Sequence, residues 1–416
     1  MRAIPTSCRK IAAIASSNRG FLAGMGMKIV ADENIPYVQQ CFSSIGDVYA
    51  LSGRAIGREA VADADVLLVR SITRVNADLL AGSKVRFVGT ATIGVDHIDV
   101  DFLNRSNIGF ASAPGSNANS AAEYVVAAVL EIAHDHQIQL RGASIGIIGV
   151  GNVGSRAAKK CTALGMKTKL NDPPLQRQAG NPKYLGIEEL FDCDFITLHT
   201  PLTFQGPDKT FHLADHKFFQ SLKPGCAFLN ASRGAVVDSD ALKAAIRAKK
   251  LKAVVLDVWE NEPNIDVELL QMVDIGTPHV AGYSLDGKIG GMIMIYKATC
   301  KYFGLEAELG VADFLPEPDA AELELDVQVD SQEELRDVVR KVYDIREDGR
   351  RLRQVKDKPA EKRAAYFDSL RKNYPIRREF HNTRVVLAGR RKEIEGALDG
   401  IGFRVIDEQD ARQKTR

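Results

Sequence analysis

Short apolar runs alternate with longer amphipathic stretches from Met27 onward. Apolar runs of this kind are typical of buried strands, and strands separated by helical stretches favour parallel α/β layers. The first strands are predicted at 28–31, 66–69, 87–89 and 109–111. They precede another apolar run at 145–148 and are too many to belong to the same sheet. We therefore expect them to form a first domain of their own.

Two later stretches are predicted to be helices, the first with amphipathic spacing. Apolar residues recur at intervals of three and four between 121 and 136, and 285–303 is also helical in pattern. The second of these helices is expected to pack back on the first domain.

The last part of the chain has a strand-and-helix pattern of its own. Pro316 and Pro318 mark a linker, and further strands are predicted at 383–389 and 403–406. Strict alternation with polar residues predicts a half-buried strand that carries Leu323, Leu325, Val327 and Val329. We expect a third, small α/β domain at about 313–416.

The apolar run at 145–148 leads into the pattern G-x-G-x-x-G, formed by Gly149, Gly151 and Gly154. In nucleotide-binding folds the first glycine permits a tight turn, the second lets a pyrophosphate approach the backbone, and the third lets the next helix pack closely. Asp172 follows near the position where such folds carry an acid for the ribose hydroxyls. Its charge would repel a 2'-phosphate, which favours NAD over NADP. The alternative is an ordinary glycine-rich turn between strand and helix.

Three polar residues, Arg233, Glu262 and His279, stand on predicted loops after apolar strands. Such loops face the ligand crevice of an open parallel sheet. Oxidation of a hydroxyl-bearing carbon needs a base, and a histidine can titrate near neutral pH. A carboxylate beside the histidine orients it, and an arginine binds a carboxylate substrate through paired hydrogen bonds. This set supports hydride-transfer chemistry without a metal.

Each of these residues also has a plainer explanation. An arginine is usually a solvated surface charge, an Asn-Glu-Pro stretch is usually a turn, and a histidine before an apolar helix often caps or packs. The combination at strand ends, downstream of a nucleotide-binding turn, favours an active site.

These segments resemble the D-isomer-specific 2-hydroxyacid dehydrogenases. The resemblance is carried by residues 149–154, 230–234 (NASRG), 257–263 (DVWENEP) and 277–279 (TPH). A second group of segments is similar to one branch of that family, which belongs to pyridoxal 5'-phosphate (vitamin B6) biosynthesis: 28–37, 69–71, 88–92, 172–174 and 279–283. The sequence departs mildly from the pattern, with Ser232 where a cysteine is expected and Pro278 where a serine is expected.

The resemblance implies a role for particular residues. Arg233 and Glu262 would be active-site residues, and His279 would donate or accept the proton. Ser71, Thr92 and Tyr283 would contact the substrate, a small phosphorylated hydroxy acid. The residues expected to contact NAD, in addition to the three glycines of the turn, are Asn152, Val153, Asp172, Thr200, Asp257 and Gly282.

The expected fold class is α/β, with two doubly wound parallel-sheet domains and a small C-terminal α/β domain. A flavodoxin-like substrate-binding (lid) domain would comprise 27–118 and 285–312, and a Rossmann NAD-binding domain 119–284. The C-terminal domain, 313–416, would serve dimerisation, as the resemblance implies. The reaction would take place in the cleft between the first two domains, which would close to exclude water.

Composition narrows the function classes. The chain has 416 residues, 45% of them hydrophobic, with 55 basic and 54 acidic residues and a formal charge of +1. This balance favours neither a nucleic-acid nor a membrane partner, and no apolar run approaches the length of a membrane span. Six cysteines without C-x-x-C spacing are typical of reduced, cytoplasmic thiols rather than of disulfides or a zinc site. No metal site is expected.

The first 26 residues differ from the rest, with basic residues around a short apolar core. A secretory signal is one interpretation, although the core is short. A disordered extension is another, and translation from Met25 or Met27 is a third. Two functional alternatives also stay open: a dehydrogenase of another 2-hydroxy acid, such as 3-phosphoglycerate, and an NAD-sensing corepressor of the same fold.

Overall fold

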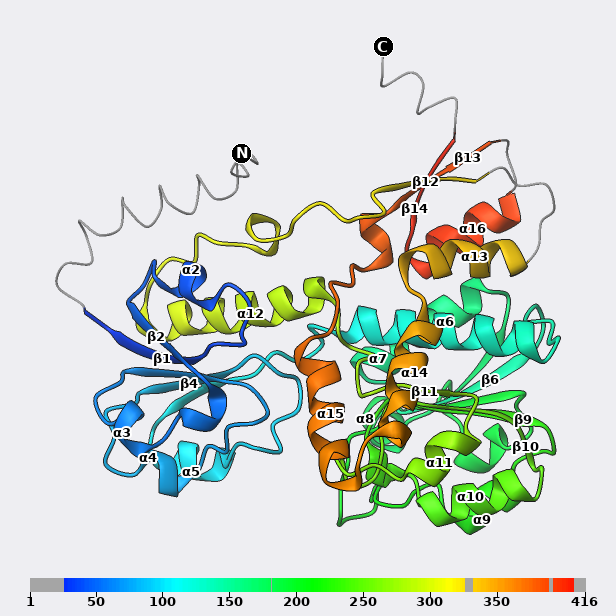
Figure 1. Cartoon of the computed structure of the whole chain (residues 1–416), viewed down its shortest axis with the longest axis horizontal. Helices are drawn as coiled ribbons and strands as arrows, with labels where there is room; N and C mark the ends of the chain where they lie inside the picture. Colours follow the sequence, from blue (N-terminus) through cyan, green and yellow to red (C-terminus); the bar gives the residue numbers. More distant parts are fainter. Residues whose placement is uncertain (1–25, 181, 326–331, 389–391, 408–416) are drawn as a thin grey trace. The chain divides into compact units, whose positions relative to one another are not determined.

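The computed structural model describes residues 26–180, 182–325, 332–388 and 392–407 (Figure 1). The chain divides into two compact units. One unit comprises the described residues up to Asn117 together with Ser284–Glu317, and the other comprises Ala118–Tyr283 together with the chain from Pro318 onward. Apart from Gly26, the expected N-terminal extension lies outside the described residues.

The first unit contains a parallel five-stranded sheet in the order β2-β1-β3-β4-β5, which is the flavodoxin-like order. The predicted strands are confirmed at β1, β3, β4 and β5. β2 was not predicted, although 48–51 (VYAL) is a short apolar run; its residues are exposed or half-buried. The strands are β1 (Lys28–Asp32), β2 (Asp47–Leu51), β3 (Val66–Val69), β4 (Phe87–Thr90) and β5 (Gly109–Ala111).

The helices of this unit cover both faces of its sheet. The helix predicted at 285–303 is confirmed as α12 (Leu285–Phe303), and it buries Ile289, Met292 and Tyr296 in a core shared with β1, β3 and β4. Ser284 caps α12 by accepting a hydrogen bond from Gly287 N. The shorter helices are α2 (Val38–Phe42), α3 (Arg58–Val61), α4 (Ala77–Leu80) and α5 (Val100–Arg105).

The second unit contains a parallel six-stranded sheet in the order β11-β10-β9-β8-β6-β7. The chain runs from β6 to β7 on one side and then returns to place β8 on the other side of β6. This reversal creates a switch point at the carboxyl ends of β6 and β8, where nucleotides bind in such sheets. The strands are β6 (Ser144–Ile148), β7 (Lys167–Asn171), β8 (Phe195–Leu198), β9 (Cys226–Asn230), β10 (Leu251–Leu256) and β11 (Ile275–Gly276).

Helices pack on both faces of the six-stranded sheet. The longest is α6 (Ala118–Asp135), which confirms the helix predicted at 121–136 and is buried along nearly its whole length. A helix this apolar on all sides must be covered by further elements. The others are α7 (Asn152–Ala163), α8 (Pro173–Ala179), α9 (His216–Ser221), α10 (Ser239–Arg247) and α11 (Val267–Met272).

The C-terminal segment, which begins at Pro318, covers α6. Its three parallel strands are β12 (Glu322–Leu325), β13 (Arg384–Leu387) and β14 (Arg404–Asp407), in that order. The predicted strands are confirmed, except that Val327 and Val329 lie outside the described residues. α13 packs on α6 and α16 packs on α7, so these helices share one core with the nucleotide sheet (Figure 1). The helices are α13 (Gln332–Val342), α14 (Ile345–Arg353), α15 (Ala360–Lys372) and α16 (Lys392–Ile401).

Candidate active site

The turn between β6 and α7 requires glycine for steric reasons. Gly149 has a φ of +87°, and a Cβ there would lie 2.8 Å from the backbone of His199. A Cβ on Gly154 would lie 1.9 Å from the carbonyl oxygen of Gly149. Around Gly151, in contrast, a Cβ would meet nothing within 4 Å, so a ligand has room to approach the backbone. Asn152 and Val153 begin α7, where the first backbone amides have no partner within the helix.

Asp172 follows β7 and lies beside this turn. Its Oδ2 accepts a hydrogen bond from Val150 N at 2.8 Å, and its Oδ1 caps α8 by accepting from Leu175 N at 3.0 Å. A carboxylate has about four lone-pair sites, so both oxygens keep capacity for ribose hydroxyls. Asp172 therefore shapes the turn, and its NAD contact stays a prediction.

Thr200 lies two residues beyond the end of β8, on the other side of the switch point. Its Oγ1 is shielded from solvent and has no hydrogen-bond partner among the described residues. Buried hydroxyls are normally paired, so a ligand at this point would satisfy it. Together with the open space at Gly151 and the first amides of α7, which have no partner within the helix, this arrangement fits a dinucleotide.

Asp257, at the end of β10, is buried and organises the loop that carries His279. It accepts hydrogen bonds from Thr277 Oγ1 at 2.6 Å, Val280 N at 2.8 Å and Ala281 N at 2.9 Å. His279 N in turn donates to the Asp257 carbonyl oxygen at 2.7 Å. The loop that follows β11 is thus tied to Asp257 at the end of β10, and Gly282 is the next residue in the chain.

Glu262 and His279 come together as a hydrogen-bonded pair. His279 Nδ1 lies 2.7 Å from Glu262 Oε2, and Glu262 Oε1 accepts from Trp259 N at 2.8 Å. Burial alone would raise the pKa of the Glu262 carboxyl, but the charge of His279 and the hydrogen bonds from His279 and Trp259 N bring it below its ordinary value. Glu262 is therefore ionised at neutral pH, and it leaves Nε2 of His279 available for substrate.

Arg233 stands on the neighbouring loop, three residues beyond the end of β9, and its guanidinium Nη1 donates to Ser232 O at 2.8 Å. A Cβ on Gly234 would lie 1.9 Å from Trp259 O, so the loops of Arg233 and Glu262 are packed against each other. Since β9, β10 and β11 are adjacent in the sheet, their loops bring Arg233, Glu262 and His279 to one edge.

Two of the expected substrate contacts belong to the first unit. Ser71 is exposed in the turn after β3. Thr92 follows β4; its Oγ1 lies 2.8 Å from Thr90 Oγ1 and donates to Gly94 O at 3.0 Å. The third, Tyr283, is the last residue of the His279 loop and packs edge-to-face against Tyr374, with ring centroids 5.7 Å apart. The substrate contacts of all three stay predictions.

Several contacts of the His279 loop were not predicted from the sequence. Trp259 Nε1 donates to Thr277 O at 2.9 Å, and Arg371 and Arg377 from the C-terminal segment also reach this loop. Trp259 lies inside a motif quoted for the family resemblance, which was the available signal. For the two arginines no local pattern existed, because their partners lie far away in the sequence.

Within the described ranges, no group of three or more His, Cys, Asp or Glu side chains is placed to hold a metal ion. Among the same residues, no helix combines the length and apolar character needed to cross a membrane. The five cysteines that the structure describes are free and buried.

Comparison with known proteins assigns the class. Residues 117–281 match the family described as "D-isomer specific 2-hydroxyacid dehydrogenase, NAD binding domain", and residues 314–400 match a "Domain of unknown function (DUF3410)". The fold and the site thus define an NAD-binding 2-hydroxyacid dehydrogenase. Curated relatives narrow it: the erythronate-4-phosphate dehydrogenase of Cronobacter sakazakii is 46% identical over 85% of this chain and 92% of its own length. That of an Escherichia coli strain is 46% identical over 86% and 94%. The chain belongs to the erythronate-4-phosphate dehydrogenase family.

Solved structures support the fold. The D-lactate dehydrogenase of Aquifex aeolicus, complexed with NAD and lactic acid, has a TM-score of 0.56 at 24% identity and covers 67% of this chain and 95% of its own. The NAD-dependent formate dehydrogenase of Staphylococcus aureus, in complex with NAD, has a TM-score of 0.55 at 23% identity and covers 67% and 96%. The expected Rossmann and flavodoxin-like sheets are confirmed.

Proposed function

We propose that this chain oxidises 4-phospho-D-erythronate at C2 to 2-oxo-3-hydroxy-4-phosphobutanoate, with NAD, in pyridoxal 5'-phosphate biosynthesis in the cytoplasm. The observation that carries the proposal is the His279–Glu262 hydrogen bond of 2.7 Å, on the same sheet whose first turn fits a dinucleotide. The membership in the erythronate-4-phosphate dehydrogenase family selects the substrate.

His279, Glu262 and Arg233 each have a defined task in this reaction. Nε2 of His279 accepts the proton of the C2 hydroxyl, and Glu262 fixes the ring so that Nδ1 keeps its proton. Arg233 binds the substrate carboxylate and polarises the forming carbonyl. Bound NAD supplies the hydride acceptor. The C2 alcohol loses one proton and one hydride, so the products are a ketone, a protonated His279 and the reduced cofactor.

The remaining substrate contacts belong to the same proposal. We assign Ser71, Thr92 and Tyr283 to the substrate, and Asn152, Val153, Asp172, Thr200, Asp257 and Gly282 to NAD. The support is the open space at Gly151, the unpaired Oγ1 of Thr200 and the position of Tyr283 at the end of the histidine loop.

The proposal is tested with purified protein, 4-phosphoerythronate and NAD, by following the absorbance of the reduced nicotinamide. We expect turnover with 4-phosphoerythronate at a kcat/KM well above that for 3-phosphoglycerate. The reverse ratio would identify a dehydrogenase of another hydroxy acid. NAD binding without oxidation of any hydroxy acid would identify a sensor.

We also propose that the enzyme is a homodimer whose contact lies in the C-terminal region, residues 313–416. Ile376 supports this assignment, since a large apolar side chain that is 69% exposed is the kind of residue that subunit contacts cover.

A further inference from the structure

The C-terminal segment that matches a domain of unknown function lies against the loop of the catalytic histidine. Its residues 371, 374 and 377 each contact that loop. Arg371 Cζ lies 5.8 Å from the centroid of the Tyr283 ring, and Tyr374 packs edge-to-face on the same ring at an interplanar angle of 88°. Arg377 Nη1 donates to Ala281 O at 3.1 Å. The segment therefore touches the two residues that flank Gly282.

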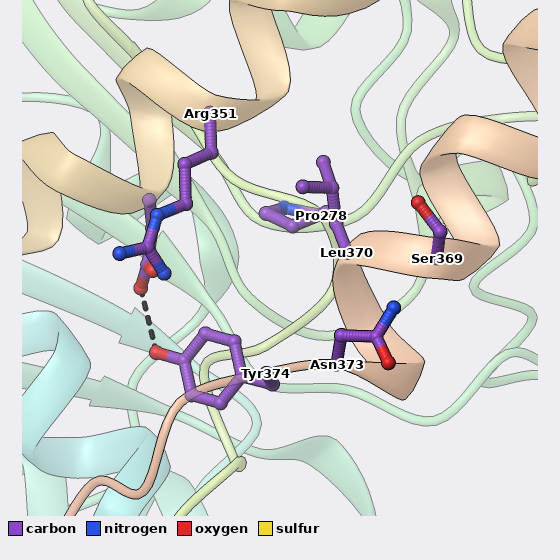
Figure 2. Close-up of a pocket in the computed structure, with 7 residues that line it drawn as sticks. Pro278, Arg351, Ser369, Leu370, Asn373 and Tyr374 are labelled. Carbon is purple, nitrogen blue, oxygen red and sulfur yellow. Dashed lines mark hydrogen bonds between the residues drawn. The ribbon is translucent and has the colours of Figure 1, made fainter.

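This contact is firmly anchored on the C-terminal side. Tyr374 Oη donates to Asp348 Oδ2 at 2.7 Å, the bond drawn in Figure 2, and Tyr343 Oη donates to the same oxygen at 3.0 Å. Arg377 is buried, lies 3.7 Å from the centroid of the Tyr343 ring and also donates to Ser120 O at 2.6 Å. A pocket of about 290 Å³ next to Tyr374 is lined by Pro278, the residue before His279, and by residues of α14 and α15 (Figure 2).

Arg371 is the residue of this segment that acts on the acid–base pair. It stands in the last turn of α15 and is half-buried, and its Nε is shielded from solvent without a hydrogen-bond partner among the described residues. Glu262 interacts electrostatically with His279 and, more weakly, with Arg371, and Arg371 interacts with the Tyr283 phenol and with the carboxylates of Glu262 and Asp257. Although burial disfavours the charged guanidinium, Tyr283 and Glu262 raise the pKa of Arg371 above its ordinary value.

We propose that Arg371 is a positioning residue of the dehydrogenase reaction, through which the C-terminal segment completes the active site. It holds Tyr283 at the end of the histidine loop and places a fixed positive charge beside Glu262. This inference rests on the proposed function and adds to it a residue outside the family's NAD-binding domain. The C-terminal segment is then needed for chemistry within its own subunit as well as for assembly.

The positive charge of Arg371 should shift the pH dependence of the reaction in a definite direction. Because Glu262 and His279 share a hydrogen bond, the uptake of a proton involves the pair rather than either residue alone. A nearby positive charge disfavours that uptake and keeps His279 free to accept the substrate proton down to lower pH. Removing the charge must move the acidic limb of the pH–rate profile to higher pH.

The test compares three variants of the full chain. Arg371→Met removes the charge, and we expect the acidic limb of kcat/KM to move upward by roughly one pH unit. Arg371→Lys keeps the charge and should leave the limb at its wild-type position. Lys372→Met, the matched control, removes a charge from the neighbouring exposed position of α15 and should also leave it there.

A second readout does not depend on activity. In NAD-free protein labelled at histidine, NMR titration follows the protonation of His279, and Arg371→Met should raise its midpoint while Lys372→Met should not. If Arg371→Met does not fold, as judged by its thermal melt, Arg371→Gln takes its place.

Unchanged profiles and midpoints in the neutral variants would overturn the positioning role, as would equal shifts in Lys372→Met. Wild-type protein that fails to oxidise 4-phosphoerythronate would instead refute the proposed function, and the NMR titration would still decide on Arg371.

Discussion

At the scale of single residues, His279 has a backbone conformation that is unfavourable for a residue with a side chain. Its φ of 58° lies in the left-handed region, which costs a residue with a Cβ about 1–2 kcal/mol. The hydrogen bonds from Val280 N and Ala281 N to Asp257, and from His279 N to the Asp257 carbonyl, offset this cost. Such strain is common where a side chain must be aimed at a reacting group.

Replacing His279 by alanine tests its role as the base. We expect His279→Ala to lower kcat by roughly 10² to 10⁴, the usual contribution of a positioned acid–base group. NAD binding should stay near the wild-type value, because the loop is held by Asp257. Steady-state kinetics and a cofactor-binding titration measure the two effects. A kcat close to wild type would exclude this base.

Replacing Glu262 by glutamine should have the opposite sign to Arg371→Met. The carboxylate favours a proton on His279, so its loss should move the acidic limb of the rate profile to lower pH. The amide still accepts from Trp259 N, which preserves the turn. The pH dependence of kcat/KM measures the shift, and an unmoved limb would show that the two residues do not titrate together.

Asp172→Asn removes the charge of this residue together with one of its two structural bonds. The amide oxygen can still accept from Val150 N or from Leu175 N, whereas the amide nitrogen cannot accept the other bond. The repulsion of a 2'-phosphate is lost, so we expect weaker selection of NAD over NADP. The ratio of the two kcat/KM values measures this preference. If the ratio does not change, another group sets the cofactor choice.

At the scale of elements, the sequence predicted what depends on local pattern. The strands with continuous apolar runs, the amphipathic α12, the glycine turn and the loop positions of Arg233, Glu262 and His279 all follow from spacing along short segments. β2 was missed although its residues 48–51 are apolar, and it differs from the predicted strands β1, β3 and β4 in having exposed or half-buried side chains. Arg377 was missed because its partner Ala281 is 96 residues away, and periodicity contains no information on such distances.

The contact between α6 and the C-terminal segment also contains a buried carboxyl group, that of Glu123. Glu123, fully buried on α6, accepts hydrogen bonds from Asn119 Nδ2 and Phe380 N at 3.0 Å each, and lies 3.8 Å from Lys160 Nζ. Burial raises the pKa of Glu123 to about 8, more than Lys160 lowers it. The folded state therefore holds a proton that the unfolded chain releases near pH 4.5.

This proton makes the stability depend on pH. The contribution of Glu123 is fully present below pH 4.5 and is lost as the pH rises toward 8, because only the unfolded state ionises in that window. In Glu123→Gln the window disappears, so the variant should gain stability relative to wild type between pH 5 and pH 8. Thermal unfolding at both pH values measures the difference. A constant difference would mean that Glu123 is ionised in the folded protein.

At the scale of the whole molecule, we propose two tasks for the C-terminal segment, and the proposed assembly role is tested apart from the contacts within the chain. Deleting it would uncover the core that α13 and α16 share with α6 and α7, so the test uses full-length protein. Light scattering should give twice the chain mass of 45.5 kDa. Ile376→Glu should produce a monomer, whereas Phe204→Glu, at a 62% exposed site of the nucleotide-binding part, should not.

A full-length monomer would refute the dimer. A dimer that persists in Ile376→Glu and is lost in Phe204→Glu would place the subunit contact in the nucleotide-binding part of the chain.

The shared core also dictates when the protein can finish folding. Arg336 and Arg346 bind Glu131 on α6 across more than 200 residues of sequence. During synthesis, at about 5–20 residues per second, the apolar surface of α6 emerges long before α13 and α16 that cover it. The nascent chain thus passes through an interval of several seconds or more in which α6 of the nucleotide-binding fold is not yet covered. The last quarter of the polypeptide ends that interval.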